Sequence, residues 1–454
     1  MKVLVSAAGV LDGRIGGGQI YVQKLAGELA RRGHDVSVVA VEAFSESGGH
    51  DAWSVRWRDW RGIPVAGVSV NAAAARIRDH WTDRSPPLLS ALRNVIDEIG
   101  PDLIHLNGLK PALTSIAVER EIPHLVTAHH AGVACPMGAL LRPDDAICPR
   151  PLDERACAAC YCRQLRGGSR RGRALAHLPP VVYRHVGQAL NLLHNPTYAG
   201  RTLMYPWLVE QAVNAKRATI RAARQWIAPS RAIADVLIRN GAEPKRVAIV
   251  PHGVEPLDPA PLTGLGTRPV RFGYVGQINR PKGLHVLLEA FSSLPQNLAR
   301  LELVGAPQGA SEQEYFKLAM RQVVGRSDVV LRGAVDHEQI QNVMGGLDVL
   351  ILPSIYLEVF GLVVLEAFSV GRPVIVTACG GPSEIVRDEI DGLVVPPNDV
   401  AALSAAMRHL AEHPDRIQQL AAGIGPVRTL ADHVDELEGL YESALQGQGL
   451  QRRV

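Results

Sequence analysis

Short apolar runs alternate with helical patterns along the chain, and this alternation restricts the possible folds more than any other feature. The first unit has an apolar run at Lys2–Ser6, a glycine loop, a helical pattern from Ile20 to Leu29 and a second run at 35–40. A strand, a helix and a strand in this order form a βαβ unit, whose strands lie parallel in one sheet. Similar runs extend this sheet at 103–106, 124–127, 226–228 and 247–250.

The alternation restarts after a segment that is rich in proline and glycine. Residues 255–269 (EPLDPAPLTGLGTRP) have no periodicity, which is typical of a linker. A chain of 454 residues is long enough for two domains. We therefore predict an α/β protein with two Rossmann-like, doubly wound parallel-sheet domains, at 1–256 and 269–428, joined by a linker at 257–268. Further strands are predicted at 271–276, 301–305, 329–332, 349–352 and 374–377.

Residues 131–224 do not follow the alternation, and we interpret them as an insertion in the first domain. They contain five of the six cysteines, and four of these follow the order Cys-x12-Cys-x8-Cys-x2-Cys. The last pair has a spacing that lets two thiolates reach one tetrahedral ion. Separate buried thiols and an iron–sulfur cluster remain alternatives, and Cys162 is a spare for Cys160. We predict a structural zinc site, without a catalytic role, at Cys135, Cys148, Cys157 and Cys160.

Charge and hydropathy exclude several classes of protein. A net charge of +3 does not suggest a nucleic-acid binder, and 47% hydrophobic residues exclude a mainly disordered chain. The longest apolar stretch, 349–368, contains a proline and two glutamates, so it is a poor membrane span. No signal segment is evident, and we predict a cytoplasmic protein with reduced thiols.

Two basic segments bear on membrane contact. The run Arg163–Arg173 is expected to be a solvated loop, and the helical pattern at 206–225 is expected to be a packed helix. A peripheral contact of either segment with anionic lipid headgroups at the inner membrane surface stays open.

A pair of acidic residues lies in an unusual apolar context after the predicted strand at 349–352. Phe360 and Gly361 indicate the turn into a helix, and Glu366 lies about two turns inside it among apolar neighbours. A carboxylate on a helix without a polar face is costly unless it has a partner, and ligand hydroxyls would be suitable partners. A core acid paired with backbone or arginine is the alternative.

The two acids, Glu358 and Glu366, have seven residues between them and are framed by Pro-Ser and Phe-Gly. This pattern resembles the signature of retaining glycosyltransferases with the two-Rossmann (GT-B) fold, family four. The resemblance spans most of the chain and is weakest at 131–224. Other motifs resemble that family in the same order: 251–254 (PHGV), 274–276 (YVG), 281–283 (PKG), 380–384 (GGPSE) and 391–397 (DGLVVPP).

The resemblance implies that the two domains face each other across a cleft. The second domain would bind a nucleotide sugar, the first would bind a sugar or lipid-linked acceptor, and a final helix within 429–454 would return to the first domain. Glu366 would hold the ribose hydroxyls, Glu358 would meet the sugar, and His129 would lie near it. Catalysis is assigned to His129, Glu358 and Lys282, without a metal or other cofactor.

The remaining candidates concern the diphosphate, on which negative charge grows as the anomeric bond breaks. Lys282 is a candidate cation, and the amides that begin a helix at Phe360, Gly361 and Leu362 favour an anion. The family often has an arginine after Gly276, where this chain has Gln277, and Arg280 is a candidate replacement. The glycine loop of Gly16, Gly17 and Gly18 also offers amides, although a flexible turn is the alternative.

From these motifs we predict a retaining hexosyltransferase that moves a sugar from a nucleotide-diphosphate sugar to a cell-surface polysaccharide or glycolipid acceptor. Two alternatives remain open at this stage. One is an inactive nucleotide-sugar-binding subunit of a polysaccharide complex, and the other is a nucleotide-sugar epimerase or phosphorylase of the same fold.

Overall fold

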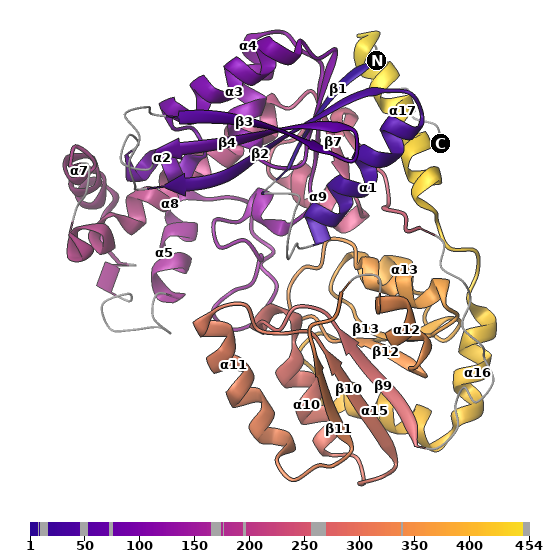
Figure 1. Ribbon diagram of the computed structural model, residues 1–454. Helices are drawn as coiled ribbons and strands as arrows, with labels where there is room; N and C mark the ends of the chain where they lie inside the picture. The colour runs from indigo at the N-terminus through magenta and orange to yellow at the C-terminus, as the bar shows by residue number, and fades with distance from the viewer. Residues whose placement is uncertain are drawn as a thin grey trace.

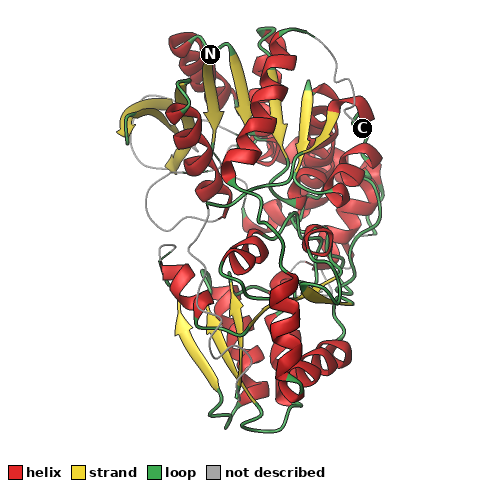
Figure 2. Ribbon diagram, turned by 90° about the vertical axis from the view of Figure 1, so that its right-hand side faces the viewer, coloured by secondary structure: helices red, strands yellow, loops and turns green. Residues whose placement is uncertain are grey.

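The structure is a computed structural model that describes residues 1–7, 9, 17–45, 53–71, 76–164, 174–175, 177–193, 197–255, 269–336 and 339–447. It contains two α/β domains, which lie one above the other in Figure 1. Apart from β3, the strands of both sheets point toward the boundary between the domains (Figure 2). The loops that follow the strands therefore meet at this boundary. The predicted linker lies outside the described residues.

The sheet of the first domain has the order β3-β4-β2-β1-β5-β6-β7-β8. All neighbours are parallel except β3 and β4, so the predicted parallel sheet is confirmed and has an antiparallel hairpin, not predicted from the sequence, at this edge. The hairpin turn consists of Arg61 and Gly62, both with positive φ, at 55° and 82°. The strands are β1 (Lys2–Ser6), β2 (Asp35–Ser45), β3 (Trp53–Trp60), β4 (Ile63–Asn71), β5 (Leu103–Leu106), β6 (His124–Thr127), β7 (Gln225–Ala228) and β8 (Val247–Ile249).

Helices cover both faces of this sheet. The longest, α8, is a packed helix, because its apolar residues Trp207, Leu208 and Val213 are buried. The helices are α1 (Gly17–Arg31), α2 (Ile77–Thr82), α3 (Pro86–Ile99), α4 (Lys110–Glu119), α5 (Glu154–Gln164), α7 (Pro180–Asn191), α8 (Tyr198–Ala222) and α9 (Arg231–Arg239), with short 3₁₀ turns η2 (Ala131–Ala134) and η4 (Pro244–Arg246). Among the described residues, no helix is long and apolar enough to cross a membrane. Most of the basic run lies outside the described residues.

The second domain has a fully parallel sheet in the order β11-β10-β9-β12-β13-β14. This is the order of a doubly wound sheet, in which the chain reverses direction between β9 and β12. Its strands are β9 (Val270–Val275), β10 (Ala299–Val304), β11 (Val329–Gly333), β12 (Val349–Leu352), β13 (Val374–Thr377) and β14 (Gly392–Val395). Its helices are η5 (Arg280–Lys282), α10 (Leu284–Ser292), α11 (Ala310–Met320), η6 (Arg321–Val323), α12 (Ile340–Gly345), α13 (Leu362–Ser369), α14 (Gly381–Ile385), α15 (Val400–Glu412) and α16 (Pro414–Gly423).

The last helix, α17 (Leu430–Leu445), packs against the first domain, next to α1 in Figure 1. Its buried residues Val434, Leu437 and Tyr441 belong to the same apolar cluster as Leu25 of α1. The Tyr441 hydroxyl is hydrogen-bonded to His105 Nδ1 at 2.6 Å. This helix therefore completes the core of the first domain, although it follows the second domain in sequence.

Candidate active site

The strand order of the second sheet indicates where a ligand would bind. In open α/β sheets, ligands bind beyond the carboxyl ends of the strands where the chain reverses direction, here between β9 and β12. The loops after these two strands approach closely at Gly283, which has a φ of 72°. A Cβ atom at this position would lie 1.9 Å from the Pro353 carbonyl oxygen, so only glycine fits. The 281–283 motif and the first acid are thereby brought together.

Lys282 and Glu358 form the charged centre of this site. The Lys282 Nζ lies 2.9 Å from both carboxylate oxygens of Glu358, and the Ser354 hydroxyl donates to Glu358 Oε2 at 2.9 Å. Burial disfavours the ammonium, but the Glu358 carboxylate outweighs it and raises the pKa of Lys282. The lysine thus stays protonated, and a ligand phosphate that reaches it would share it with Glu358.

The amides at the start of α13 face the same edge of the sheet. Gly361 begins the helix with a φ of 88°, a left-handed conformation that favours glycine. The loop after β13 supports this turn, because Glu358 N donates to the Cys379 carbonyl at 2.7 Å and Gly381 N donates to the Glu358 carbonyl at 3.0 Å. The first amides of a helix have no partner inside it, so this turn can donate to an anion.

Glu366 lies on the second turn of α13 and is half-buried. Burial raises its pKa, and the positive charge of Lys24 in α1 acts in the opposite direction. Within the described part of the chain, no side chain or backbone group is hydrogen-bonded to its carboxylate. Two interpretations of Glu366 were drawn from the sequence. The absence of a partner among the described residues disfavours a core acid paired within the protein, and an acid that binds ligand hydroxyls is left as a prediction.

His129 lies in a cluster of rings on the first-domain side of the boundary. Its Nε2 is hydrogen-bonded to Asn107 Oδ1, and its ring centroid lies 4.5 Å from that of Tyr21 and 5.4 Å from that of His252. Burial, followed by the neighbouring His252, lowers the pKa of His129 well below the usual value, so the imidazole is neutral. His252 in turn contacts Phe360 of the second domain, with 5.2 Å between ring centroids. The cluster thus adjoins the turn into α13.

Two polar contacts join the domains beside this site. Arg280 is hydrogen-bonded and ion-paired to Asp145 of the insertion, so its guanidinium links the two domains, and its predicted contact with a phosphate stays a prediction. The Glu384 carboxylate accepts hydrogen bonds from the Arg231 and Ala232 amides at the start of α9, both at 2.7 Å. The 380–384 motif therefore contributes to the domain boundary.

The remaining candidates for contact with the diphosphate are Gln277, Gly276 and the glycine loop before α1. Gln277 is exposed, and its carbonyl accepts a hydrogen bond from the Tyr274 hydroxyl. Gly276 follows β9 directly, and its amide donates to the Val304 carbonyl at 3.0 Å. Gly17 and Gly18 are exposed and begin α1, with open space where a Cβ would lie. Gly16 lies outside the described residues.

The four cysteines of the predicted zinc site lie in one region of the insertion. Burial raises the pKa of Cys157 to about 11, and the thiols of Cys135, Cys148 and Cys160 contribute in the same direction. Across the described ranges, however, no three histidine, cysteine or acidic side chains are grouped closely enough to hold a metal ion. The zinc site therefore stays a prediction.

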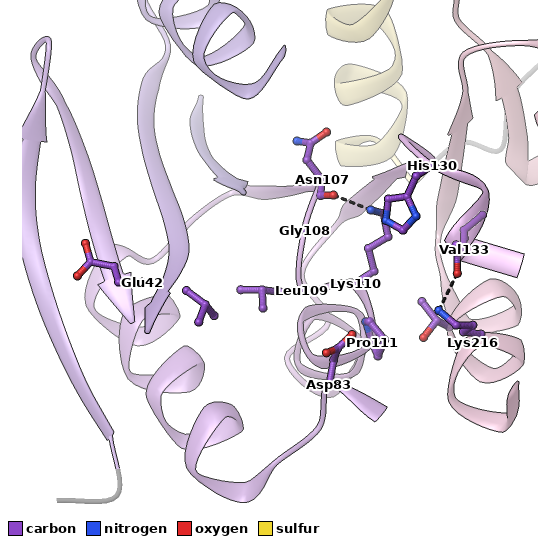
Figure 3. A pocket seen from close by; sticks show the side chains of 13 residues that line it. Glu42, Asp83, Asn107, Gly108, Leu109, Lys110, Pro111, His130, Val133 and Lys216 are labelled. Atoms are coloured by element: carbon purple, nitrogen blue, oxygen red, sulfur yellow. Dashed lines mark hydrogen bonds between the residues drawn. The ribbon is translucent and has the colours of Figure 1, made fainter. Parts of the chain in front are cut away.

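A cavity of about 390 Å³ in the first domain was not anticipated from the sequence. Figure 3 shows Glu42 on one side of it, Lys216 on the other, and Lys110 and His130 between them. Lys110 follows the carboxyl end of β5, where ligand-binding residues of parallel sheets gather, and this position was the signal available in the sequence.

The fold has clear counterparts among solved structures. Sucrose-phosphate synthase from Thermosynechococcus elongatus has a TM-score of 0.68 at 19% identity, covering 99% of this chain and 100% of that one. Alr3699/HepE from Anabaena, solved in complex with UDP-glucose, has a TM-score of 0.63 at 18% identity, covering 98% and 100%. At these identities, the likeness establishes the arrangement of the two domains and nothing about the substrate.

Family models match each domain separately. The model described as Glycosyltransferase Family 4 matches residues 15–152, and that described as Glycosyl transferases group 1 matches residues 263–423. The chain belongs to the GT-B glycosyltransferases. Among curated relatives of this GT-B glycosyltransferase, D-inositol 3-phosphate glycosyltransferase of Streptomyces bingchenggensis is 32% identical over 45% of this chain and 49% of its own length. Glycogen synthase of Mycobacterium tuberculosis is 31% identical over 41% and 42%. The chain thus aligns with about half the length of these relatives.

Proposed function

We propose that this protein transfers a sugar from a nucleotide-diphosphate sugar to a hydroxyl of an acceptor, with retention of the anomeric configuration. The observation that carries the proposal is the arrangement at the reversal point of the second sheet. There, Lys282, the first amides of α13 and the unpaired carboxylate of Glu366 surround one edge of the sheet. The complex of UDP-glucose with a protein of the same fold supports a nucleotide sugar as the donor.

Each part of this arrangement suits one part of the donor. As the bond from the anomeric carbon to the phosphate oxygen breaks, charge develops on the diphosphate, and Lys282 with the α13 amides stabilises it. Glu366 accepts hydrogen bonds from the ribose hydroxyls, which do not change during the reaction. His129 is neutral and thus suited to hydrogen-bond a hydroxyl of the donor sugar.

Retention follows from the state of Glu358 in this proposal. Its carboxylate is occupied by Lys282 and Ser354, so it is not free to attack the anomeric carbon. The acceptor oxygen then attacks from the face that the diphosphate leaves, and the leaving phosphate oxygen takes the acceptor proton. One bond at the anomeric carbon breaks and one forms on the same face, and no covalent enzyme intermediate is required.

The acceptor is proposed more broadly. The curated relatives include enzymes named for D-inositol 3-phosphate and for glycogen synthesis, so sugars and polyols are the class to test. A cell-surface polysaccharide or glycolipid acceptor remains our proposal from the family resemblance. A catalytic metal has no role in the proposed mechanism.

The test is a screen of UDP-, GDP- and ADP-sugars. A true donor at about 100 times its dissociation constant stabilises the fold by about 2.7 kcal/mol, which thermal unfolding detects. With an acceptor, we expect release of the nucleoside diphosphate and, by NMR, a product with the donor's anomeric configuration. Binding without release would instead favour an inactive binding subunit, and an inverted product would overturn the retaining mechanism.

A further inference from the structure

The cavity of the first domain lies between elements that are distant in sequence. Its lining comes from the second half of β2, the turn before α3, the segment that leads into α4, the segment around η2 and the last turns of α8. Asn107 lines the cavity and also accepts the hydrogen bond from His129. The cavity is therefore next to the ring cluster that contacts the second domain.

Two lysines whose ammonium groups donate to backbone carbonyls line this cavity. Lys110 Nζ donates to the Asn107 carbonyl at 2.5 Å, and Lys216 Nζ donates to the Gly132 carbonyl at 2.6 Å (Figure 3). Within the described ranges, neither ammonium group has a carboxylate oxygen within ion-pair distance. Each lysine thus brings a positive charge to the cavity that no carboxylate neutralises directly.

The surroundings make these charges costly. Burial, and then the charge of Lys216, lowers the pKa of Lys110 to about 8, while the carboxylate of Asp83, which also lines the cavity, acts in the opposite direction. Burial also lowers the pKa of Lys216. Glu42 lines the cavity as well, but it is ion-paired to Arg58 at 2.6 Å. Charge that is desolvated in this way is expensive unless an anion compensates it.

The backbone adds to the positive potential. Helix α4 begins at Lys110, and its N-cap residue Leu109 has a left-handed conformation and no side-chain cap. The start of a helix carries a partial positive charge, and here it adjoins the two ammonium groups. Three sources of positive potential, two from α4 and one from α8, thus converge on one cavity.

We infer that this cavity binds the phosphate group of a phosphorylated acceptor, between Lys110 and Lys216. The inference rests on the proposed function, because it identifies the acceptor class of the same transfer reaction. A phosphate dianion balances two ammonium groups and offers oxygens to donors on both sides. The phosphate itself belongs either to a water-soluble sugar or polyol phosphate or to a lipid-linked diphosphate.

The first experiment measures phosphate binding by calorimetry in the presence of saturating UDP, which fills the donor site. We expect inorganic phosphate to bind the wild type, and Lys110→Gln and Lys216→Gln each to weaken this binding at least tenfold. Lys245→Gln, at an exposed lysine of the same domain, is the matched control and should bind normally. Phosphate binding that is absent from the wild type, or unchanged in both cavity variants, overturns the inference.

UDP titration of the same variants separates the two proposals. Normal UDP binding without phosphate binding leaves the donor site intact and rejects the cavity assignment. Failure of every nucleotide to bind the wild type rejects the proposed function instead. A polyol monophosphate and vesicles that carry a lipid-linked diphosphate distinguish the two sources, since the one that competes with inorganic phosphate identifies the acceptor.

A further variant tests the inference in case the glutamine variants fail to fold. Lys216→Met keeps the length of the side chain and removes the charge, so without phosphate it should unfold at a higher temperature than the wild type. Phosphate should then raise the unfolding temperature of the wild type but not of this variant. A variant that phosphate still stabilises to the same extent would contradict the inference.

Discussion

The two domains hold their functional lysines in opposite ways. In the second domain, Lys282 lies 2.9 Å from both oxygens of Glu358, and the carboxylate raises its pKa. In the first domain, Lys110 and Lys216 donate to backbone carbonyls, and burial lowers their pKa values. The charged form of lysine is therefore stabilised by a carboxylate at the first site, whereas burial disfavours it at the second. At the proposed donor site the Glu358 carboxylate supplies the negative charge that pairs with the lysine. At the proposed acceptor site this negative charge would come from the phosphate of the ligand.

The largest effect is expected from Lys282→Ala, which removes the cation from the donor side. Because the charge on the diphosphate develops in the transition state, kcat should fall by roughly 100- to 1000-fold, which corresponds to about 2.7–4 kcal/mol. Steady-state kinetics with a verified donor and acceptor measures this. Lys317→Ala, at an exposed lysine of the same domain, should behave like the wild type. A Lys282→Ala enzyme with a normal kcat would show that the Lys282 cation does not stabilise the charge that develops on the diphosphate.

Glu366→Ala tests the donor side in another way. The ribose hydroxyls are bound equally before and during the reaction, so the loss should raise the KM for the donor and leave kcat nearly unchanged. Hydrogen bonds to a charged group contribute about 1.5–3 kcal/mol, so KM should rise at least tenfold. Glu314→Ala, at an exposed acid of α11, is the control. A fall in kcat without a change in KM would remove Glu366 from the ribose.

The lowered pKa of Lys110 predicts how pH affects the acceptor side. Folded and empty, Lys110 loses its proton near pH 8, well below the usual value of 10.5, while a bound phosphate holds the proton in place. Affinity for inorganic phosphate should therefore be greatest below pH 8 and fall by up to about tenfold per pH unit above it.

Calorimetry between about pH 8 and 9.5 measures this, because inorganic phosphate is mainly a dianion in that range. Asp83, Glu42 and His130 also line the cavity, and burial lowers the pKa of His130 to about 3, so its ring stays neutral in this range. Burial lowers the pKa of Lys216 as well, so deprotonation of this lysine would weaken phosphate binding in the same direction. Binding that stays constant to pH 9.5 would show that neither lysine holds the anion.

The smallest effect on the comparison is expected from the cysteines. Lys216 donates to the Gly132 carbonyl, and Cys135 follows three residues later, so a metal at the four cysteines would stiffen one wall of the cavity. Elemental analysis of protein purified without a histidine tag should find about one zinc per chain. Cys157→Ser should lose the zinc and weaken phosphate binding several-fold, with UDP binding unchanged. Metal-free protein of full stability would leave the thiols as ordinary side chains.

Much of this architecture follows from local patterns in the sequence. The inner strands, such as β12 and β13, are continuous apolar runs because both faces of a parallel sheet are buried. The hairpin of β3 and β4 escaped prediction, since β3 (WSVRWRDW) is half-exposed and its turn has Arg61 where asparagine or aspartate is usual. Glu366 is a candidate from the sequence because a carboxylate among apolar neighbours is locally unusual, and its role stays a prediction.

Features that depend on distant segments were not predictable in the same way. Lys216 looks like a surface residue of an amphipathic helix, and it lines a cavity because α4 and η2 pack around it. Arg280 is a candidate phosphate-binding residue from its place in the loop, and its contact with Asp145 of the insertion could not be predicted from that place. No local spacing encodes either contact, because each is created when elements far apart in the chain meet.

The return of α17 has a consequence for the synthesis of the protein. This helix supplies Leu437 and Tyr441 to the core of the first domain, next to Leu25 of α1. During translation, that core stays open along α1 until the whole second domain has left the ribosome. The domain made first is therefore completed last, and the part of the apolar surface of α1 that α17 covers stays exposed to chaperones and to aggregation until α17 has been made.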